Sequence, residues 1–225
     1  RYFSDQRSCN TSVTNPMPQA DFIALNGDSV INAYLDAGYQ RESLVECEAL
    51  RYNFLDGFKS EAPINIPNDQ VKVLVLGDYV SKSTVKMLKM LEKTISLLDT
   101  PMAFTVKPHP NNVISVEDYP SLKFKIVMNP LCEILYDYDI VYTSNITSSA
   151  VEAYCAGLPV IVMLDEETLN YSPLRGQNNV KFVGSEKQLS DALQDSVQGE
   201  ISETVKHEFF FLDPDLPRWR ALLKM

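Results

Sequence analysis

Long apolar runs are missing from this 225-residue sequence, and so is any excess of positive charge. No stretch approaches the roughly 20 apolar residues that a membrane-spanning helix needs. The first residues, Arg1-Tyr-Phe-Ser-Asp-Gln-Arg-Ser, are too polar for a signal peptide. Twenty Lys and Arg against 30 Asp and Glu give a net charge of −10. A net negative charge does not attract the phosphate backbone of DNA or RNA. We therefore expect a cytoplasmic protein without a nucleic-acid partner and with at most peripheral membrane association.

Cysteine is scarce, and several motifs of common enzymes are absent. The four cysteines, Cys9, Cys47, Cys132 and Cys155, form no C-x-x-C pair and have no histidine at metal-ligand spacing. We expect buried thiols in a reducing compartment, with no metal and no bound cofactor. The sequence also lacks G-x-S-x-G, a Walker A motif and G-x-G-x-x-G. Hydrolase, ATPase and dehydrogenase functions therefore have no support.

From Val71 onwards, apolar strands alternate with helical patterns. Val71–Leu76 is a nearly continuous apolar run, as expected of a strand buried on both faces. Ser81–Leu98 repeats apolar residues at the spacing of an amphipathic helix. Further strands are predicted at 102–106, 124–128, 139–143, 159–163 and 180–183, and further helices at 130–136, 148–155 and 186–195. This alternation predicts an α/β fold with a doubly wound parallel, Rossmann-like sheet.

The two ends of the chain follow a different pattern. Phe22–Leu25 is predicted as a strand, 29–36 as a helix, and 43–54 shows helical spacing, which is too little to close a core alone. We therefore interpret residues 1–58 as the remnant or last unit of an N-terminal domain, and the missing initiator Met fits a fragment or a processed chain. Residues 59–70 are predicted as a linker, 71–200 as the ligand-binding domain and 201–225 as a C-terminal helical tail.

One loop at the carboxyl end of a predicted strand carries a constrained histidine. In doubly wound sheets, ligands bind where these loops converge. Two prolines in Lys107-Pro-His109-Pro fix the backbone around the imidazole. The imidazole can donate to a phosphate oxygen, and the Lys107 ammonium adds positive charge. The alternative is that proline ends the strand and His109 makes a local cap.

A second loop ends in three hydroxyl residues, Thr147, Ser148 and Ser149, which open a predicted helix. A helix N-terminus offers unpaired N–H groups and partial positive charge, which suit a phosphate. The alternative is a capping box formed by Ser149 and Glu152, which needs no ligand. Glu152 is accordingly either the capping carboxylate or a group for ribose hydroxyls.

Two further loops give weaker signals. Gly77 permits close approach of the backbone, which makes Gly77 and Asp78 candidates for nucleotide or ribose contacts. Arg175, within Asn170–Gly176, is a candidate anion-binding or lid residue, or part of a long surface turn. We interpret two D-x-D triplets, Asp137-Tyr-Asp139 and Asp213-Pro-Asp215, as structural, and His207 as solvated.

These motifs give the chain a resemblance to the C-terminal half of GT-B glycosyltransferases that build bacterial surface carbohydrate. Lys107-Pro-His109-Pro resembles the HP motif of sialyl-, polysialyl-, Kdo and polyglycerol-phosphate transferases, and Thr147-Ser-Ser149 resembles their Ser/Ser-Thr motif. Segments from Asn26-Gly27 and Glu48-Ala-Leu-Arg51-Tyr52 to Leu216-Pro-Arg-Trp-Arg are similar to a less characterised group of large transferases. The resemblance covers most of the chain.

The resemblance implies a metal-independent donor-binding domain that holds the phosphate of a nucleotide sugar, with a CMP-linked donor expected. The expected partners are the nucleotide sugar, a carbohydrate or lipid-linked acceptor and a missing N-terminal domain. The related inverting sialyltransferases use an acidic base in a D/E-D/E-G motif; Asp56-Gly57 matches it poorly, so no catalytic base is assigned. The alternatives are a non-catalytic binding or assembly module and a UDP-sugar epimerase.

Overall fold

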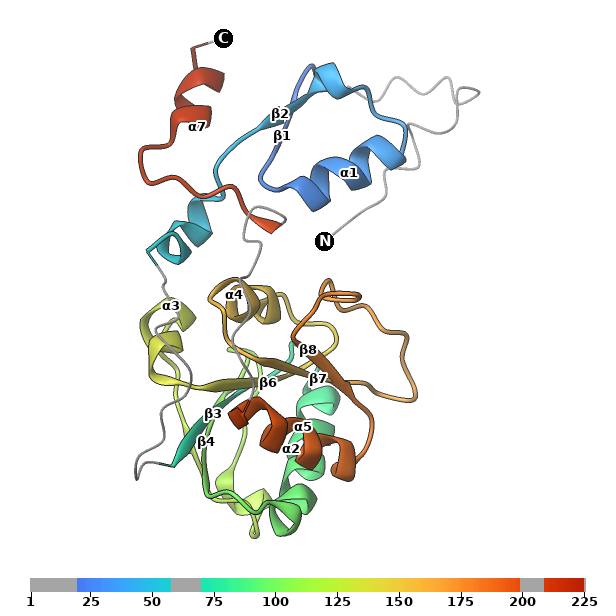
Figure 1. The fold of residues 1–225 in the computed structure, drawn as a ribbon, viewed down its shortest axis with the longest axis vertical. Helices are drawn as coiled ribbons and strands as arrows, with labels where there is room; N and C mark the ends of the chain where they lie inside the picture. The colour runs from blue at the N-terminus through green and yellow to red at the C-terminus, as the bar shows by residue number, and fades with distance from the viewer. Residues whose placement is uncertain (1–19, 58–69, 199–208, 225) are drawn as a thin grey trace. The chain divides into compact units, whose positions relative to one another are not determined.

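The computed structural model describes residues 20–57, 70–198 and 209–224, which form two compact units (Figure 1). Residues 20–57 and 209–224 make the first unit, and residues 70–198 make the second. Residues 1–19, the predicted linker up to residue 69, residues 199–208 with His207, and Met225 lie outside the described residues.

The second unit contains the predicted parallel sheet. Its six strands lie in the order β5-β4-β3-β6-β7-β8, and every neighbouring pair is parallel. The strands are β3 (Val71–Leu76), β4 (Met102–Lys107), β5 (Phe124–Ile126), β6 (Ile140–Ser144), β7 (Val160–Met163) and β8 (Val180–Val183). The α/β doubly wound prediction is confirmed. The strand order reverses between β3 and β6, which makes their carboxyl ends the topological switch point where ligands of such sheets bind.

Helices cover both faces of this sheet. Figure 1 shows α2 (Ser81–Thr94) and α5 (Glu186–Gln198) on one face, and α3 (Leu131–Ile134) and α4 (Ser149–Cys155) on the other. Strands β6 and β7 are buried at every position; β7 is wholly apolar, as expected of a strand covered on both faces, whereas β6 ends in the buried polar residues Thr143 and Ser144. The core beneath α2 and α5 includes Val73, Leu88, Tyr142, Ile161 and Leu193. Short 3-10 turns, η3 (Ile95–Leu97), η4 (Val116–Asp118) and η5 (Leu135–Asp137), complete the unit.

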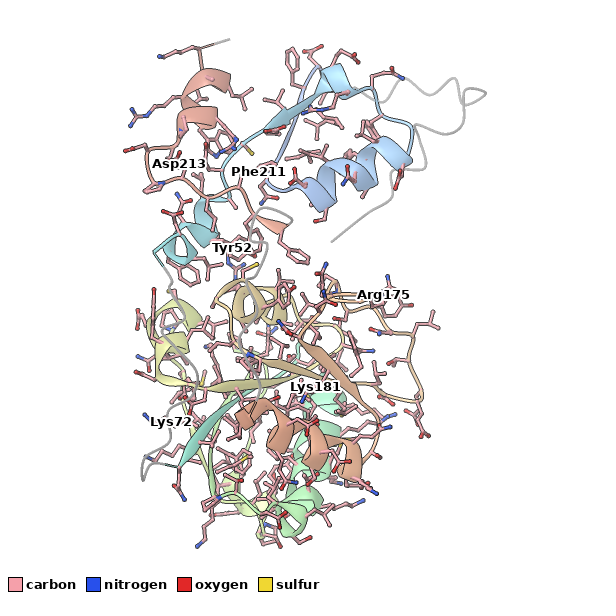
Figure 2. All side chains as sticks on the ribbon, in the orientation of Figure 1. Tyr52, Lys72, Arg175, Lys181, Phe211 and Asp213 are labelled. Atoms are coloured by element: carbon pink, nitrogen blue, oxygen red, sulfur yellow. The ribbon has the colours of Figure 1, made fainter. Side chains whose placement is uncertain are left out.

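The first unit is a small parallel sheet with helices. Strands β1 (Ile23–Leu25) and β2 (Leu44–Glu46) pair in parallel, flanked by α1 (Asp28–Asp36), η1 (Arg41–Ser43), η2 (Leu50–Leu55) and α7 (Pro217–Leu222). Helical structure was predicted for 43–54; that prediction is wrong, because these residues form β2 and the 3-10 turn η2. Leu25, Ile31 and Leu44 form a core with Phe211, labelled in Figure 2, so residues from both ends of the chain build one unit.

Glu48 ties the C-terminal segment into the first unit. Its side chain is fully buried, and its carboxylate accepts hydrogen bonds from the backbone N–H groups of Arg218 (2.9 Å) and Trp219 (3.0 Å) and from the Arg218 guanidinium (3.3 Å). Burial favours the neutral acid, but these hydrogen bonds outweigh it and hold the pKa of Glu48 below its ordinary value. The Glu48 carbonyl also accepts from the Trp219 indole N–H at 2.8 Å.

The cysteines and the two D-x-D triplets can also be placed. Cys47 and Cys155 are buried free thiols, as predicted, whereas Cys132 is exposed because it lies on the outer side of the short helix α3; Cys9 lies outside the described residues. Asp139 accepts from the Lys72 backbone N–H, and Asp213 from that of Asp215, so both triplets make structural contacts. In the described part of the chain, no helix is long and apolar enough to cross a membrane.

Candidate functional site

Three polar loops leave the sheet at one edge. In the sheet, Leu76 at the end of β3 is aligned with Lys107 of β4 on one side and with Thr143 of β6 on the other. The loops that carry Gly77–Val80, Lys107–Asn112 and Ser144–Ser149 therefore begin side by side, with the β3 loop in the middle. Because neighbouring strands lie about 4.8 Å apart, the two outer loops start roughly 10 Å from each other. The predicted placement of both outer loops at the carboxyl edge is confirmed.

Gly77 allows two of these loops to touch. A Cβ at this position would lie 3.1 Å from Pro108 Cα, 3.2 Å from His109 N and 3.3 Å from Lys107 O. All three are backbone atoms, which cannot rotate away as a side chain can. The Gly77 N–H donates to the Lys107 carbonyl at 2.9 Å. The predicted close approach at Gly77 is therefore an approach to the His109 loop of the same chain.

Asp78 connects the β3 loop to the end of β6. Its side chain is buried, and its carboxylate accepts from the Ser144 hydroxyl at 2.5 Å and from the Val80 N–H at 2.9 Å. Its own N–H donates to the Thr84 hydroxyl at 2.8 Å, at the start of α2. Both carboxylate oxygens are thus used within the protein, and Asp78 fixes the switch point between β3 and β6.

Asn112 connects the same β3 loop to the histidine loop. Its side-chain amide donates to the carbonyls of Asp78 (2.6 Å) and Tyr79 (3.3 Å), and its N–H donates to the His109 carbonyl (2.8 Å). Sequence reasoning missed this residue. The available signal was its position directly after the Pro-His-Pro stretch, where an amide side chain can bond loop backbone.

The backbone fixes the orientation and the tautomer of the His109 ring. Its Nδ1 atom accepts a hydrogen bond from the Asn111 N–H at 3.2 Å. In the neutral imidazole, the proton must then be on Nε2, so the ring presents an N–H donor without being charged. The Tyr79 ring, 66% exposed, meets the imidazole edge-on with ring centroids 5.2 Å apart. His109 is half-buried, and its bond to the Asn111 N–H is a local contact of the kind that the capping alternative expects.

Lys107 is the last residue of β4, and its side chain is half-buried. Within the described residues, the Lys107 ammonium forms no ion pair. A lysine at the carboxyl edge of a parallel sheet without a protein counter-charge can contribute its charge to an anion.

The hydroxyl residues begin α4, but they do not form the predicted capping box. The N-cap of α4 is Ser148, not Ser149, and the Ser148 side chain makes no capping hydrogen bond. Thr147 Oγ1 accepts from the Ser149 N–H at 3.4 Å, a local turn. Glu152 is buried within α4. The capping alternative is wrong because Ser149 is already the first residue of the helix and Ser148 occupies the cap position.

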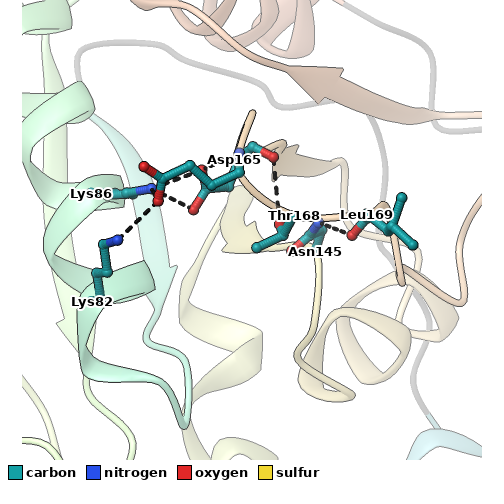
Figure 3. Close-up of polar contacts among 7 residues, drawn as sticks. Lys82, Lys86, Asn145, Asp165, Thr168 and Leu169 are labelled. Carbon is teal, nitrogen blue, oxygen red and sulfur yellow. Dashed lines mark hydrogen bonds and ion pairs between the residues drawn. The ribbon is translucent and has the colours of Figure 1, made fainter.

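A fourth loop, residues 164–179 between β7 and β8, is fastened to α2 and to the β6 loop (Figure 3). Lys86 contacts both carboxylate oxygens of Asp165 at 2.8 Å and Glu167 at 2.8 Å, and Lys82 contacts Glu167 at 2.9 Å. Lys86 lowers the pKa of Asp165, and Lys86 with Lys82 lowers the pKa of Glu167 to about 2. The Asn145 amide donates to the Leu169 carbonyl at 3.0 Å.

Arg175 lies on this loop and is exposed (Figure 2). The loop turns at Arg175, whose N–H donates to the Ser172 carbonyl at 3.4 Å. Two neighbours, Ser172 and Leu174, are buried and anchor the turn. The segment is therefore an anchored surface turn with an exposed arginine, and the anion-binding role of Arg175 stays a prediction. Among the described residues, no cluster of His, Cys, Asp or Glu could hold a metal ion.

Three solved structures illustrate what this chain is similar to in fold. S. aureus MnaA with UDP superposes with a TM-score of 0.60 and 14% identity, over 90% of this chain and 58% of that chain. A protein from Listeria monocytogenes assigned as a UDP-N-acetylglucosamine 2-epimerase gives 0.59 and 13%, over 84% and 55%. A variant of the wall teichoic acid polymerase TagF gives 0.56 and 15%, over 86% and 54%.

These likenesses define the class of fold. The chain has a GT-B-like fold, shared by glycosyltransferases and by UDP-N-acetylglucosamine 2-epimerases. It spans between 54% and 58% of the length of the three proteins named above. No protein-family profile matches the sequence, and no curated protein matches it either.

Proposed function

We propose that residues 70–198 bind the nucleotide-activated sugar donor of a GT-B-type glycosyltransferase. One observation carries this proposal. A histidine whose Nδ1 accepts a backbone N–H, which leaves Nε2 to donate, and a helix start with three hydroxyl residues lie at the same sheet edge, beside the switch point between β3 and β6. That combination supplies neutral donors, one ammonium and a helix N-terminus, which suit a phosphate diester or pyrophosphate.

Each residue has a distinct role in this proposal. His109 donates from Nε2 to a donor phosphate oxygen, and Lys107 adds charge. Thr147, Ser148 and Ser149 bind the same phosphate through hydroxyl and N–H groups. Gly77 and Asp78 act indirectly, because both are engaged in holding the loops together.

The chemistry is transfer of a sugar from nucleotide to acceptor. The bond between the anomeric carbon and the donor phosphate oxygen breaks, and that oxygen keeps the electron pair; an acceptor hydroxyl oxygen forms the new bond and gives up its proton to a base. Hydrogen-bond donors placed where this negative charge develops lower the barrier, and they need no metal. The proposed acceptor of the full-length protein is a carbohydrate or lipid-linked carbohydrate of a bacterial surface polysaccharide. We assign the catalytic base to no residue of this chain.

Cytidine is the proposed nucleotide, on the strength of the resemblance to HP-motif transferases of CMP- and CDP-linked donors. Isothermal calorimetry of the chain with CMP, CDP, UMP, UDP and GDP tests the proposal. Tightest binding of a cytidine nucleotide supports it. A clear preference for GDP contradicts it.

A UDP-sugar epimerase is the second candidate, favoured by the name of the Listeria monocytogenes protein and by the UDP in the S. aureus MnaA structure, both of the same fold. Tightest binding of UDP in the same panel, followed by 2-epimerisation of UDP-N-acetylglucosamine by the full-length protein, supports that candidate. Nucleotide binding with neither activity in the full-length protein supports a non-catalytic module.

A further inference from the structure

The first unit contains a pocket that the proposed donor site does not use. Its volume is about 320 Å³, and every lining residue belongs to the first unit. It lies where β1 and β2 end, next to Asn26 after β1 and Cys47 after β2. The carboxyl ends of neighbouring parallel strands are where α/β sheets bind ligands. The volume is near the lower limit of roughly 300 Å³ for small-molecule sites.

One wall of this pocket is a locked aromatic ring. The Trp219 indole N–H donates to the Glu48 carbonyl at 2.8 Å, and the Trp219 backbone N–H donates to the Glu48 carboxylate at 3.0 Å. The indole is therefore held at both its ring and its backbone, while the residue stays only half-buried. An aromatic ring fixed in advance loses little conformational entropy when a ligand packs against it.

Polar side chains form another part of the pocket lining. The Tyr52 ring stacks on Phe210, with centroids 4.0 Å apart, and the Arg51 guanidinium lies 5.4 Å from the Tyr52 centroid. Tyr52 and Arg51 line the pocket together with Asn26. These groups supply an amide, a phenol and a guanidinium, and the Glu48 carboxylate is already engaged with Arg218 and Trp219.

We propose that this pocket binds a single pyranose ring. A sugar ring has apolar C–H faces, which pack against an indole, and hydroxyls at its rim, which bond amide and guanidinium groups. The size suits one monosaccharide unit and is too small for a complete nucleotide sugar. Binding of the sugar in this pocket does not depend on the proposed function of residues 70–198.

The chain itself provides a specific probe, because Trp219 is the only tryptophan in the sequence. Tryptophan fluorescence of the full 225-residue chain is recorded while glucose, galactose, mannose, N-acetylglucosamine, N-acetylgalactosamine or N-acetylneuraminic acid is added at millimolar concentrations. At least one sugar produces a saturable change in intensity or wavelength. Asn26→Ala weakens that sugar roughly threefold and Arg51→Ala roughly tenfold, as expected for a neutral and a charge-assisted hydrogen bond.

Two control variants locate the sugar in this pocket. Arg175→Ala, an exposed arginine of the second unit, leaves the sugar affinity unchanged. Trp219→Phe removes the fluorescent reporter. Sugar affinity in this variant is therefore measured by calorimetry, and it should persist because phenylalanine keeps an aromatic face. The proposal is overturned if no sugar gives a saturable change, if CMP or UDP alone gives the same change, or if Asn26→Ala and Arg51→Ala both bind like wild type. Nucleotide binding is measured separately, so either proposal can fail alone.

Discussion

At Gly77, the absence of a side chain is required by the backbone of a neighbouring loop. The Cβ of any other residue would stand 3.1–3.3 Å from three backbone atoms of the Lys107–His109 segment. Glycine is therefore needed here for space, since the position is not one of the positive-φ glycines. The orientation of His109 depends on this contact, because the loop that carries the imidazole lies directly on Gly77.

Gly77→Ala should consequently destabilise the chain by about 1–3 kcal/mol, the usual cost of overpacking. It should also weaken nucleotide binding, because the histidine loop must move to admit the methyl group. Thermal unfolding and calorimetry measure the two effects. Gly184→Ala is the matched control: the nearest atom to its Cβ is a flexible Gln188 side-chain oxygen at 3.7 Å. Equal thermal stability and equal nucleotide affinity of the two variants would show that the close approach at Gly77 affects neither the fold nor binding.

The carboxylate of Glu48 should make the stability of the fold depend on pH. Its pKa in the folded protein lies below the ordinary value, so the ionised carboxylate stabilises the fold at pH values above about 4.3, the usual pKa of a free glutamate. This stabilisation is lost as the pH falls through the lowered pKa. Glu48→Gln should cost about 1–3 kcal/mol near neutral pH.

The difference between wild type and Glu48→Gln should therefore narrow on acidification below about pH 4. Thermal unfolding of both proteins across this range provides the measurement. Glu42→Gln is the control, because Glu42 is an exposed carboxylate of the same unit, where the loss of a surface charge costs little. A gap that stayed constant with pH would refute the role of the Glu48 charge.

At the scale of elements, the sequence predicted the sheet well because the central strands β3 and β7 are almost unbroken apolar runs and the other strands alternate regularly with helical patterns. Strand β2 was missed because it has only three residues, Leu44–Glu46, and is stabilised by pairing with β1, some 21 positions away by register. Local periodicity carries no information on such a pairing. The cap of α4 was misplaced by one residue, which was enough to predict a capping box that does not form.

The residues of the candidate site also divide into those that local sequence signals reveal and those that they do not. His109 and Thr147–Ser149 could be found, because prolines and hydroxyls at strand ends are local signals. The bond between Asp78 and Ser144 joins residues 66 positions apart, so no local pattern reveals it. Ser144→Ala should remove a hydroxyl donor from a buried carboxylate and cost about 1–3 kcal/mol.

Nucleotide affinity should fall with Ser144→Ala as well, because the link between the β3 and β6 loops is lost. The control is Ser196→Ala, which removes a similarly buried hydroxyl that bonds the Ala192 carbonyl within α5, away from this edge. Calorimetry and thermal unfolding distinguish the two. If both variants lost stability but neither lost affinity, the Asp78–Ser144 bond would serve the fold alone.

The loop 164–179 is a further element whose position depends on charge. Lys86→Met should release Asp165 and Glu167, and amide hydrogen exchange over residues 165–171 should accelerate. Lys93→Met is the control on the same helix, because Lys93 pairs with Glu186 instead. Unchanged exchange in Lys86→Met would mean that Leu174 and Asn145 alone hold the loop.

At the scale of the whole molecule, the described residues form two units, each with its own parallel sheet and its own polar groups at strand ends. The larger unit carries the proposed donor site, and the smaller unit carries the pocket beside Trp219. Residues from the two ends of the chain are needed for the smaller unit, because Phe211 completes its core and Glu48 binds the start of α7. Removal of residues 209–224 would leave that core open.

The central claim is that His109 holds a donor phosphate at the carboxyl edge of the larger sheet, and a calorimetric titration tests it most directly. CMP, CDP, UMP, UDP and GDP are titrated into wild type, His109→Ala and the control Asn129→Ala, an exposed loop residue after β5. A cytidine nucleotide should bind most tightly. His109→Ala should weaken it roughly ten- to a hundredfold through loss of one hydrogen bond to a charged group, with an unchanged melting temperature and with Asn129→Ala like wild type. If His109→Ala bound every nucleotide as tightly as wild type does, His109 would not hold the donor phosphate.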